Sequence, residues 1–374
     1  MTRKPPFRYD IVGSFLRPAA LKEARANEES GKITPEELKA VEKEAIADLV
    51  RKEKENGLHA FTDGEFPRAF WHLDFLSSLK GAAVVSAKAW SVHFKGHQPK
   101  AETLRAVGKL SFFDDNPFLE QFRYLQSFAD ADHVAKMTLP SPSMFHLITS
   151  VREEHPVLPD FYANDEDLYF ADITKAYQDA LLAFYKEGCR YLQFDDTSWG
   201  EFCSAEKRKA YADRGIDVDA VARRYVKVLN DVLSVKPADM TVTMHICRGN
   251  FRSTWFSSGG YEPIANILFS HCRIDGFFLE YDSDRAGDFR PLRFIQDQNV
   301  ILGLITSKTP ELEDKETVKA RIQEAARYVP LDQLCLSPQC GFASTEEGNI
   351  LTEEEQWAKI RLIRDIAKEV WQDA

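Results

Sequence analysis

Short apolar runs alternate with longer amphipathic stretches from one end of the chain to the other, and this alternation limits the possible folds more than any other feature. The pattern is typical of repeated β/α units and of a mostly parallel sheet. The predicted strands are approximately Tyr9 to Val12, His59 to Thr62, Val134 to Leu139, Tyr191 to Phe194, Thr241 to His245, Gly276 to Leu279, Asn299 to Leu304 and Gln333 to Leu336. These eight units predict an α/β fold, a single (β/α)8 TIM barrel.

Two of the intervening helices have readable starts. Thr34 is followed by Pro35 at the first helical position and by Glu37, and Thr352 is followed by Glu355. A Thr with a Glu three residues later is a capping box, in which both side chains accept hydrogen bonds from free backbone N–H groups. We therefore expect helices to begin directly after Thr34 and after Thr352.

The stretch from about 81 to 113 interrupts the β/α rhythm. Ala82 to Val85 and Ser91 to Phe94 are predicted strands of a β-hairpin, inserted after the second barrel strand and covering one rim of the barrel. No low-complexity linker or internal repeat divides the chain, so residues 1–374 are predicted to form a single domain.

Composition narrows the class of partner. A net charge of −11 spread along the sequence argues against nucleic acid or an anionic membrane as partner, since both need clustered Lys and Arg. Small molecules are the expected partners. We expect no membrane span, because no apolar run reaches about 18 residues. We also expect a cytoplasmic protein whose six cysteines are reduced thiols. The sequence does not indicate an oligomeric state.

Polar residues follow most of the predicted strands. In an α/β barrel the active site lies at the carboxyl ends of the strands, so these residues are expected to converge on one mouth. The candidates there are Ser14, Glu65, Asp195, His245, Cys247, Glu280, Lys308 and Cys340.

His245 and Cys247 are two positions apart at the end of a predicted strand, so their side chains lean to the same side. Together with Cys340 and a carboxylate at Glu280 they make an N, S, S, O donor set that suits tetrahedral Zn²⁺. We therefore predict a zinc site. Asp282 or Asp284 are alternatives to Glu280 as the oxygen ligand.

The remaining candidates have two interpretations each. Glu65 and Asp195 either hold an ammonium group or move a proton at the mouth, or they form a salt bridge with a loop arginine such as Arg68. Ser14 follows Gly13 in a tight turn, where free backbone N–H groups can meet a carboxylate, or it caps a helix. Arg248, Asn250 and Arg252 bind an anionic part of a substrate or pair with other charges at the surface.

With these residues in place, the sequence resembles the catalytic barrel of cobalamin-independent methionine synthase and its shorter single-barrel relatives. The resemblance runs from Ile11-Val12-Gly13-Ser14-Phe15 to Cys340, and its most specific element is the His-x-Cys, Glu and Cys set. It implies zinc ligands at His245, Cys247, Glu280 and Cys340. It implies that Ser14, Glu65 and Asp195 hold the amino and carboxyl groups of homocysteine, whose thiolate takes up a methyl group to give methionine.

The chain departs from that family at three points. It holds one barrel where the full-length enzyme has two. The stretch 138–143 offers only small residues and prolines where the family has a tryptophan that stacks on the pterin of folate. Lys308, within Thr306-Ser307-Lys308-Thr309-Pro310, stands in place of the proton-donor histidine, and we predict it as the catalytic proton donor. The methyl donor is therefore 5-methyltetrahydrofolate or another methyl compound.

Three other functions fit parts of the pattern. One is zinc-dependent alkyl transfer to a different thiol, as in epoxyalkane:coenzyme M transferase. Another is a metal-free barrel similar to uroporphyrinogen decarboxylase, which needs arginines around a large anion. The third is a non-catalytic barrel in which zinc only ties strands together. Metal content separates the second from the others, and the effect of losing Cys340 on stability and on activity separates the third.

Overall fold

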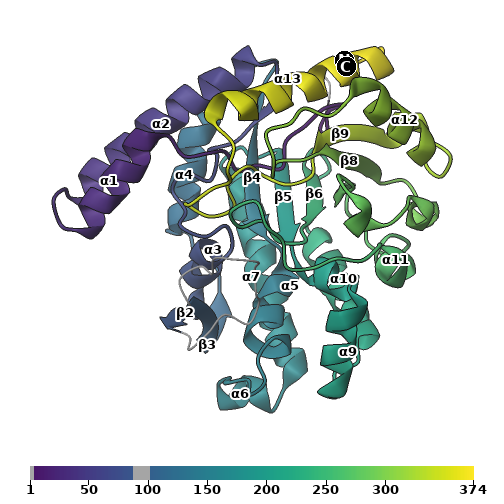
Figure 1. The fold of residues 1–374 in the computed structure, drawn as a ribbon. Helices are drawn as coiled ribbons and strands as arrows, with labels where there is room; N and C mark the ends of the chain where they lie inside the picture. Colours follow the sequence, from purple (N-terminus) through teal and green to yellow (C-terminus); the bar gives the residue numbers. More distant parts are fainter. Residues whose placement is uncertain (1–3, 87–101) are drawn as a thin grey trace.

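A curved parallel sheet is the centre of the molecule (Figure 1). The computed structural model describes residues 4–86 and 102–374. Within them, seven strands pair in the order β1-β4-β5-β6-β7-β8-β9, each parallel to its neighbours. The strands are β1 (Ala60–Phe61), β4 (Val134–Pro140), β5 (Tyr191–Asp196), β6 (Thr241–Ile246), β7 (Gly276–Glu280), β8 (Asn299–Ile305) and β9 (Leu334–Pro338). This is an α/β, TIM-barrel-like fold, and each of these strands overlaps one predicted from the sequence.

The remaining predicted strand, Tyr9 to Val12, which comes first in the chain, is not a regular strand. Tyr9 makes a single parallel bridge with Leu336 of β9, and further along the Phe15 N–H donates to the Gly64 carbonyl beyond β1 at 3.1 Å. The segment therefore lies between the two edges of the sheet without forming a ladder.

Side chains explain why that ladder is missing. The carbonyl of Ile11 accepts from Lys136, that of Val12 from the Gln193 amide at 2.7 Å, and that of Gly13 from the Thr62 hydroxyl at 2.6 Å. These three carbonyls therefore have hydrogen-bond donors without strand pairing. The pattern of apolar runs in the sequence does not show that distant side chains donate to these carbonyls.

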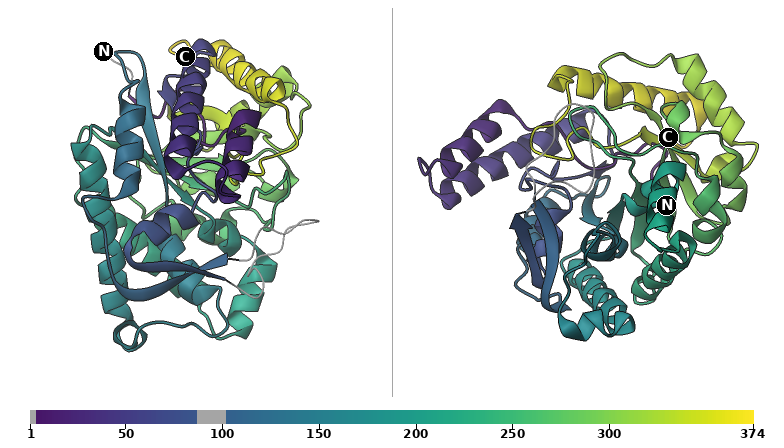
Figure 2. Two further views of the ribbon diagram at one scale, coloured as in Figure 1. Left: turned by 90° about the vertical axis from the view of Figure 1, so that its left-hand side faces the viewer. Right: turned by 60° about the horizontal axis from the view of Figure 1, so that its bottom comes forward.

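Helices pack around the outside of the sheet (Figure 2). They are α1 (Ala19–Glu29), α2 (Pro35–Glu55), α3 (Leu73–Ser78), α4 (Pro117–Gln126), α5 (Pro142–His146), α6 (Asp160–Ala163), α7 (Glu166–Lys186), α8 (Ser198–Phe202), α9 (Ala205–Asp213), α10 (Val218–Leu233), α11 (Glu262–Leu268), α12 (Lys315–Ala325) and α13 (Glu353–Val370). Both predicted capping boxes are confirmed, at Thr34 before α2 and at Thr352 before α13. Figure 1 shows α1 and α2 as an antiparallel pair that extends away from the sheet.

A two-stranded antiparallel sheet follows α3. Its strands are β2 (Lys80–Ser86) and β3 (Glu102–Ser111), which contact α3 and α7. The predicted strand Ala82 to Val85 lies within β2, whereas the predicted strand Ser91 to Phe94 falls outside the described residues. The partner of β2 is thus further along the chain than the sequence pattern suggested.

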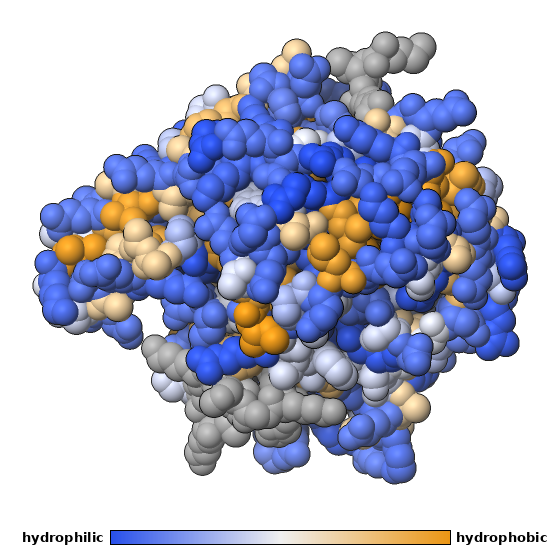
Figure 3. All heavy atoms as spheres, turned by 45° about the horizontal axis from the view of Figure 1, so that its top comes forward, coloured by the Kyte–Doolittle hydropathy of each residue, from blue (hydrophilic) through white to orange (hydrophobic). Residues whose placement is uncertain are grey.

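The outer surface is mainly hydrophilic on the face drawn in Figure 3, with apolar residues in small separate areas. Among the described helices, none combines the length and the apolar character needed to cross a membrane. Apolar side chains of the strands and helices instead meet in one large core, to which β4 through β9 and α7, α10 and α13 contribute. That core fixes the strands whose carboxyl ends carry the site.

Candidate metal centre and cavity

The four predicted metal ligands come together at the carboxyl edge of the sheet. His245 is in β6, Cys247 directly follows it, Glu280 is the last residue of β7, and Cys340 lies two residues beyond β9. All four are buried, and one ligand atom from each lies within 4.8 Å of the others. Parallel strands end at a common edge, which is why residues nearly a hundred positions apart can meet here.

The spacing of this cluster fits a zinc ion. The sulfurs of Cys247 and Cys340 are 3.8 Å apart, and His245 Nε2 is 3.8 Å from Glu280 Oε1. Two thiolates about 2.3 Å from a tetrahedral zinc would be separated by about 3.8 Å. Asp282, considered above as an alternative oxygen ligand, is not one of the four described residues whose ligand atoms come together. The donor set and the sulfur separation therefore both suit zinc, with Glu280 as the carboxylate.

The cluster gathers negative charge. The hydrogen bond from Cys247 lowers the pKa of the Cys340 thiol to about 7, and it raises the pKa of Cys247. Burial lowers the pKa of His245, but the hydrogen bond with Asp195 and the charges of Cys340 and Glu280 outweigh it and bring that pKa to about 9. Two thiols and a carboxyl packed this closely favour a bound cation.

Neighbouring groups orient the ligands. His245 Nδ1 lies 3.1 Å from Asp195 Oδ1, and the backbone N–H of Gly249 donates to the sulfur of Cys247 at 3.3 Å. Glu280 accepts from the N–H of Arg248 at 3.2 Å and from the Arg285 guanidinium at 3.1 Å. Such contacts hold ligand side chains in place before a metal arrives.

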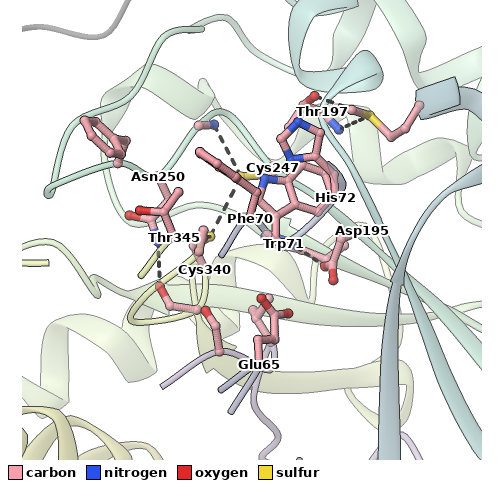
Figure 4. A pocket seen from close by; sticks show the side chains of 18 of the residues that line it. Glu65, Phe70, Trp71, His72, Asp195, Thr197, Cys247, Asn250, Cys340 and Thr345 are labelled. Carbon is pink, nitrogen blue, oxygen red and sulfur yellow. Dashed lines mark hydrogen bonds and ion pairs between the residues drawn. The ribbon is translucent and has the colours of Figure 1, made fainter. Parts of the chain in front are cut away.

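A cavity of about 60 Å³ opens next to the cluster (Figure 4). Its lining includes Ser14, Glu65 and Asp195, the predicted substrate residues. Much of the rest is aromatic, with Phe70, Trp71, His72, Phe251 and Phe256 in the lining. We did not identify this aromatic wall from the sequence, although the run Phe70-Trp71-His72 falls in a loop after a predicted strand, where cavity residues are expected.

Glu65 presents a carboxylate oxygen with no hydrogen-bond partner among the described residues, its Oε2. Its other oxygen accepts from Thr138 at 3.0 Å and lies 3.5 Å from the Arg68 guanidinium, so the alternative pairing with Arg68 is also present. Burial raises the pKa of Glu65 to about 7, against the opposing charge of Arg68, and Asp195 adds to the rise. An acidic group is thus available to a cationic ligand.

Asp195 and Ser14 have no arginine partner in the hydrogen bonds of the described residues. Asp195 accepts from the Gln193 amide at 2.9 Å, besides its contact with His245. The Ser14 hydroxyl accepts from the N–H of Ala343 at 3.2 Å. Ser14 is therefore tied to the loop that carries Cys340 and does not cap a helix.

Lys308 is buried close to the cluster, but it is not among the residues that line the cavity. Its ammonium donates to Asn250 Oδ1 at 2.9 Å and to the Gly249 carbonyl at 3.2 Å. Its predicted role as a proton donor stays a prediction. Arg248 is also buried, with its guanidinium 4.4 Å from the centre of the Tyr261 ring, so it does not bind a surface anion; Arg252 is exposed.

The structure is thus a TIM-barrel-like protein with a buried His, Cys, Glu and Cys set, suited to hold a metal ion, at the carboxyl ends of its strands. The family model described as "Cobalamin-independent synthase, Catalytic domain" matches residues 9–369. The chain belongs to this family, the cobalamin-independent methionine synthases, which are methyltransferases. This confirms the family predicted from the sequence.

Individual relatives are similar to this chain over nearly its whole length. The protein named YxjG of Bacillus subtilis (strain 168) is 47% identical over 371 residues, which is 99% of this chain and 96% of the relative. A solved structure of a candidate vitamin-B12 independent methionine synthase from Listeria monocytogenes has a TM-score of 0.78 at 40% identity, covering 99% of both chains. A B12-independent methionine synthase from Shewanella sp. W3-18-1, solved with selenomethionine, has a TM-score of 0.68 at 18% identity over 97% of both chains and shares the fold.

Proposed function

We propose that this protein transfers a methyl group to the thiol of homocysteine to give methionine, with zinc held by His245, Cys247, Glu280 and Cys340. The observation that carries the proposal is the buried four-residue cluster beside a cavity that also contains the Glu65 carboxylate. Zinc in such a set lowers the pKa of a bound thiol, so that a thiolate is present at neutral pH. Two thiolates and one carboxylate leave the occupied site with a net charge of about −1, which keeps sulfur electron-rich.

In this proposal, different side chains of the cavity bind different groups of the substrate. Glu65 and Asp195 are placed to bind the ammonium group of homocysteine, and Ser14 its carboxylate. The substrate sulfur then attacks the methyl carbon; the bond from methyl to donor breaks, and its electron pair and a proton go to the donor. Lys308 is the proposed source of that proton.

The aromatic wall has two tasks in this scheme. Phe70, Trp71 and the phenylalanines at 251 and 256 exclude water from the reacting sulfur, and they offer apolar surface to the methyl donor. The tryptophan missing from 138–143 thus has a counterpart in Trp71, which comes from a different loop. The donor is 5-methyltetrahydrofolate or another methyl compound.

The Shewanella enzyme supports the choice of substrate, because it was solved in complex with selenomethionine, the selenium analogue of the proposed product. The family match leaves the interpretation as a metal-free decarboxylase barrel without support. Alkyl transfer to a thiol other than homocysteine is the second candidate, since it would use the same metal cluster.

A binding and turnover experiment tests the proposal. Zinc-loaded protein is titrated calorimetrically with L-homocysteine and with other thiols, and methionine formation is measured with methylfolate monoglutamate, methylcobalamin and S-methyl compounds. We expect about one zinc per chain, homocysteine binding, and loss of both in Cys340→Ser. Tight binding of another thiol without homocysteine binding would establish the second candidate instead, and protein purified without chelator but lacking zinc would reject both.

A further inference from the structure

Asn250 joins three loops at the edge of the metal cluster. Its side-chain oxygen accepts from the Lys308 ammonium at 2.9 Å and from the Asn349 amide at 3.1 Å. Its side-chain nitrogen donates to the Gly341 carbonyl at 2.7 Å. These partners belong to the loops that follow β8 and β9, whereas Asn250 belongs to the loop that follows β6. One buried amide therefore connects all three.

The loops, in addition to the sheet, set the distance between the two thiols. Cys247 follows β6 and Cys340 follows β9, and two other strands lie between β6 and β9 in the sheet. Both cysteines lie beyond the ends of their strands, so the positions of the two sulfurs also depend on the loops. Asn250 is three residues past Cys247, and its side chain contacts Gly341, the residue after Cys340.

The Lys308 side chain also bonds to backbone carbonyls of the loop that follows β6. The Gly249 carbonyl accepts from Lys308 at 3.2 Å, while the N–H of Gly249 donates to the sulfur of Cys247 at 3.3 Å. A third acceptor of the ammonium is the Thr254 carbonyl at 3.5 Å. With three oxygens around it, the ammonium has a partner for each of its three donors.

The far end of the loop is held as well. Arg252 and Ser253 have positive φ angles of 44° and 64°, a conformation that side chains other than glycine rarely adopt. The N–H of Ser253 donates to the Asn349 side-chain oxygen at 2.8 Å. Backbone in this region persists where surrounding contacts hold it, and here Asn349 is that contact.

We infer that Asn250, with Lys308 and Asn349, is a positioning residue that sets the separation of the Cys247 and Cys340 sulfurs for metal binding. This inference rests on the metal centre of the proposed function. It gives Lys308 a positioning role through Asn250 and the Gly249 peptide, in addition to the proton transfer proposed above.

Cobalt binding to the full-length protein tests the inference without any turnover. Co²⁺ is titrated into metal-free protein, and the thiolate-to-cobalt and d–d absorption bands are recorded. Asn250→Asp keeps an oxygen for Lys308 and Asn349 but removes the donor to Gly341. We expect Co²⁺ affinity to fall by about tenfold to a hundredfold, with a shifted thiolate band.

Asn116→Asp is the matched control. Asn116 is also buried, and its amide donates to the Ser78 hydroxyl at 2.9 Å, far along the chain from the cluster. The same substitution there removes one donor and should leave the Co²⁺ affinity and spectrum unchanged. Asn349→Ala, at a half-buried position, is a second variant that keeps the test valid if Asn250→Asp does not fold; it should weaken Co²⁺ binding as well.

Lys308→Met separates positioning from proton donation. A positioning role predicts weaker Co²⁺ binding, and a double variant with Asn250→Asp that loses less than the sum of the single variants. Wild-type Co²⁺ affinity and spectrum in Asn250→Asp, Asn349→Ala and Lys308→Met would overturn the inference while leaving the proposed function intact. Wild-type protein that shows no thiolate band with Co²⁺ would overturn both.

Discussion

Glu65 makes the binding of an amino acid depend on pH. Its side chain is buried, one of its oxygens has no partner among the described residues, and burial raises its pKa to about 7 against the charge of Arg68. Above that pH the carboxylate is charged and can pair with a ligand ammonium. Below it the group is neutral and the ion pair is lost, so affinity should fall as the pH falls.

The size of the effect follows from the pKa. A carboxyl with a pKa of about 7 is about one tenth protonated at pH 8 and about nine tenths protonated at pH 6. If only the charged form binds, the Kd for an amino-acid ligand should rise by about tenfold between pH 8 and pH 6. L-methionine is the ligand of choice, because it has no thiol and its ammonium group stays charged over this range.

Calorimetric titration of the zinc-loaded protein at several pH values measures this change. Glu65→Gln should bind L-methionine weakly at every pH. Glu53→Gln is the matched control, since Glu53 is a buried carboxyl whose pKa is also raised by burial, yet it accepts from the Thr62 N–H and does not line the cavity. A Kd that does not change with pH in the wild-type protein, or an unchanged slope in Glu65→Gln, would refute this reasoning.

Three further predictions concern the metal centre and its support. A methyl group on Gly200 would lie 2.1 Å from the Cys247 carbonyl, so Gly200→Ala should cost about 1–3 kcal/mol of stability and weaken metal binding, as measured by thermal unfolding with and without zinc; an unchanged melting temperature would contradict this. Free zinc at about 100 times its Kd should stabilise the fold by about 2.7 kcal/mol, and Cys340→Ala should abolish that gain in a denaturant titration. Asp196 accepts from three serine hydroxyls, among them Ser198. Asp196→Ala should therefore lower the free energy of unfolding by several kilocalories per mole. An unchanged free energy of unfolding would show that these bonds contribute little to stability.

Residue type and position along the chain were enough to predict which four candidate ligands lie close together. His245, Cys247, Glu280 and Cys340 each follow or end a strand, and parallel strands bring such residues to one edge. The capping boxes were equally readable, because they depend on side chains only three residues apart. Both inferences need only local spacing or the geometry of a parallel sheet.

Features that depend on contacts between distant side chains were not readable in this way. The segment after Tyr9 looks like a strand, yet Lys136, Gln193 and Thr62 occupy its carbonyls. The place of Trp71 in the cavity depends on the path of its loop, and the spacing of apolar residues in the sequence does not predict that path. In each case a long-range partner decides the outcome.

The seam, where β9 meets the segment around Tyr9, also affects local opening of the folded protein. Because single contacts rather than a ladder close the sheet there, amide protons along this seam should exchange with solvent through smaller, local openings than those of β4 to β8. Ser14 and the loop beyond β9 lie beside that seam, so an opening would loosen one wall of the cavity while the sheet at its back stays folded.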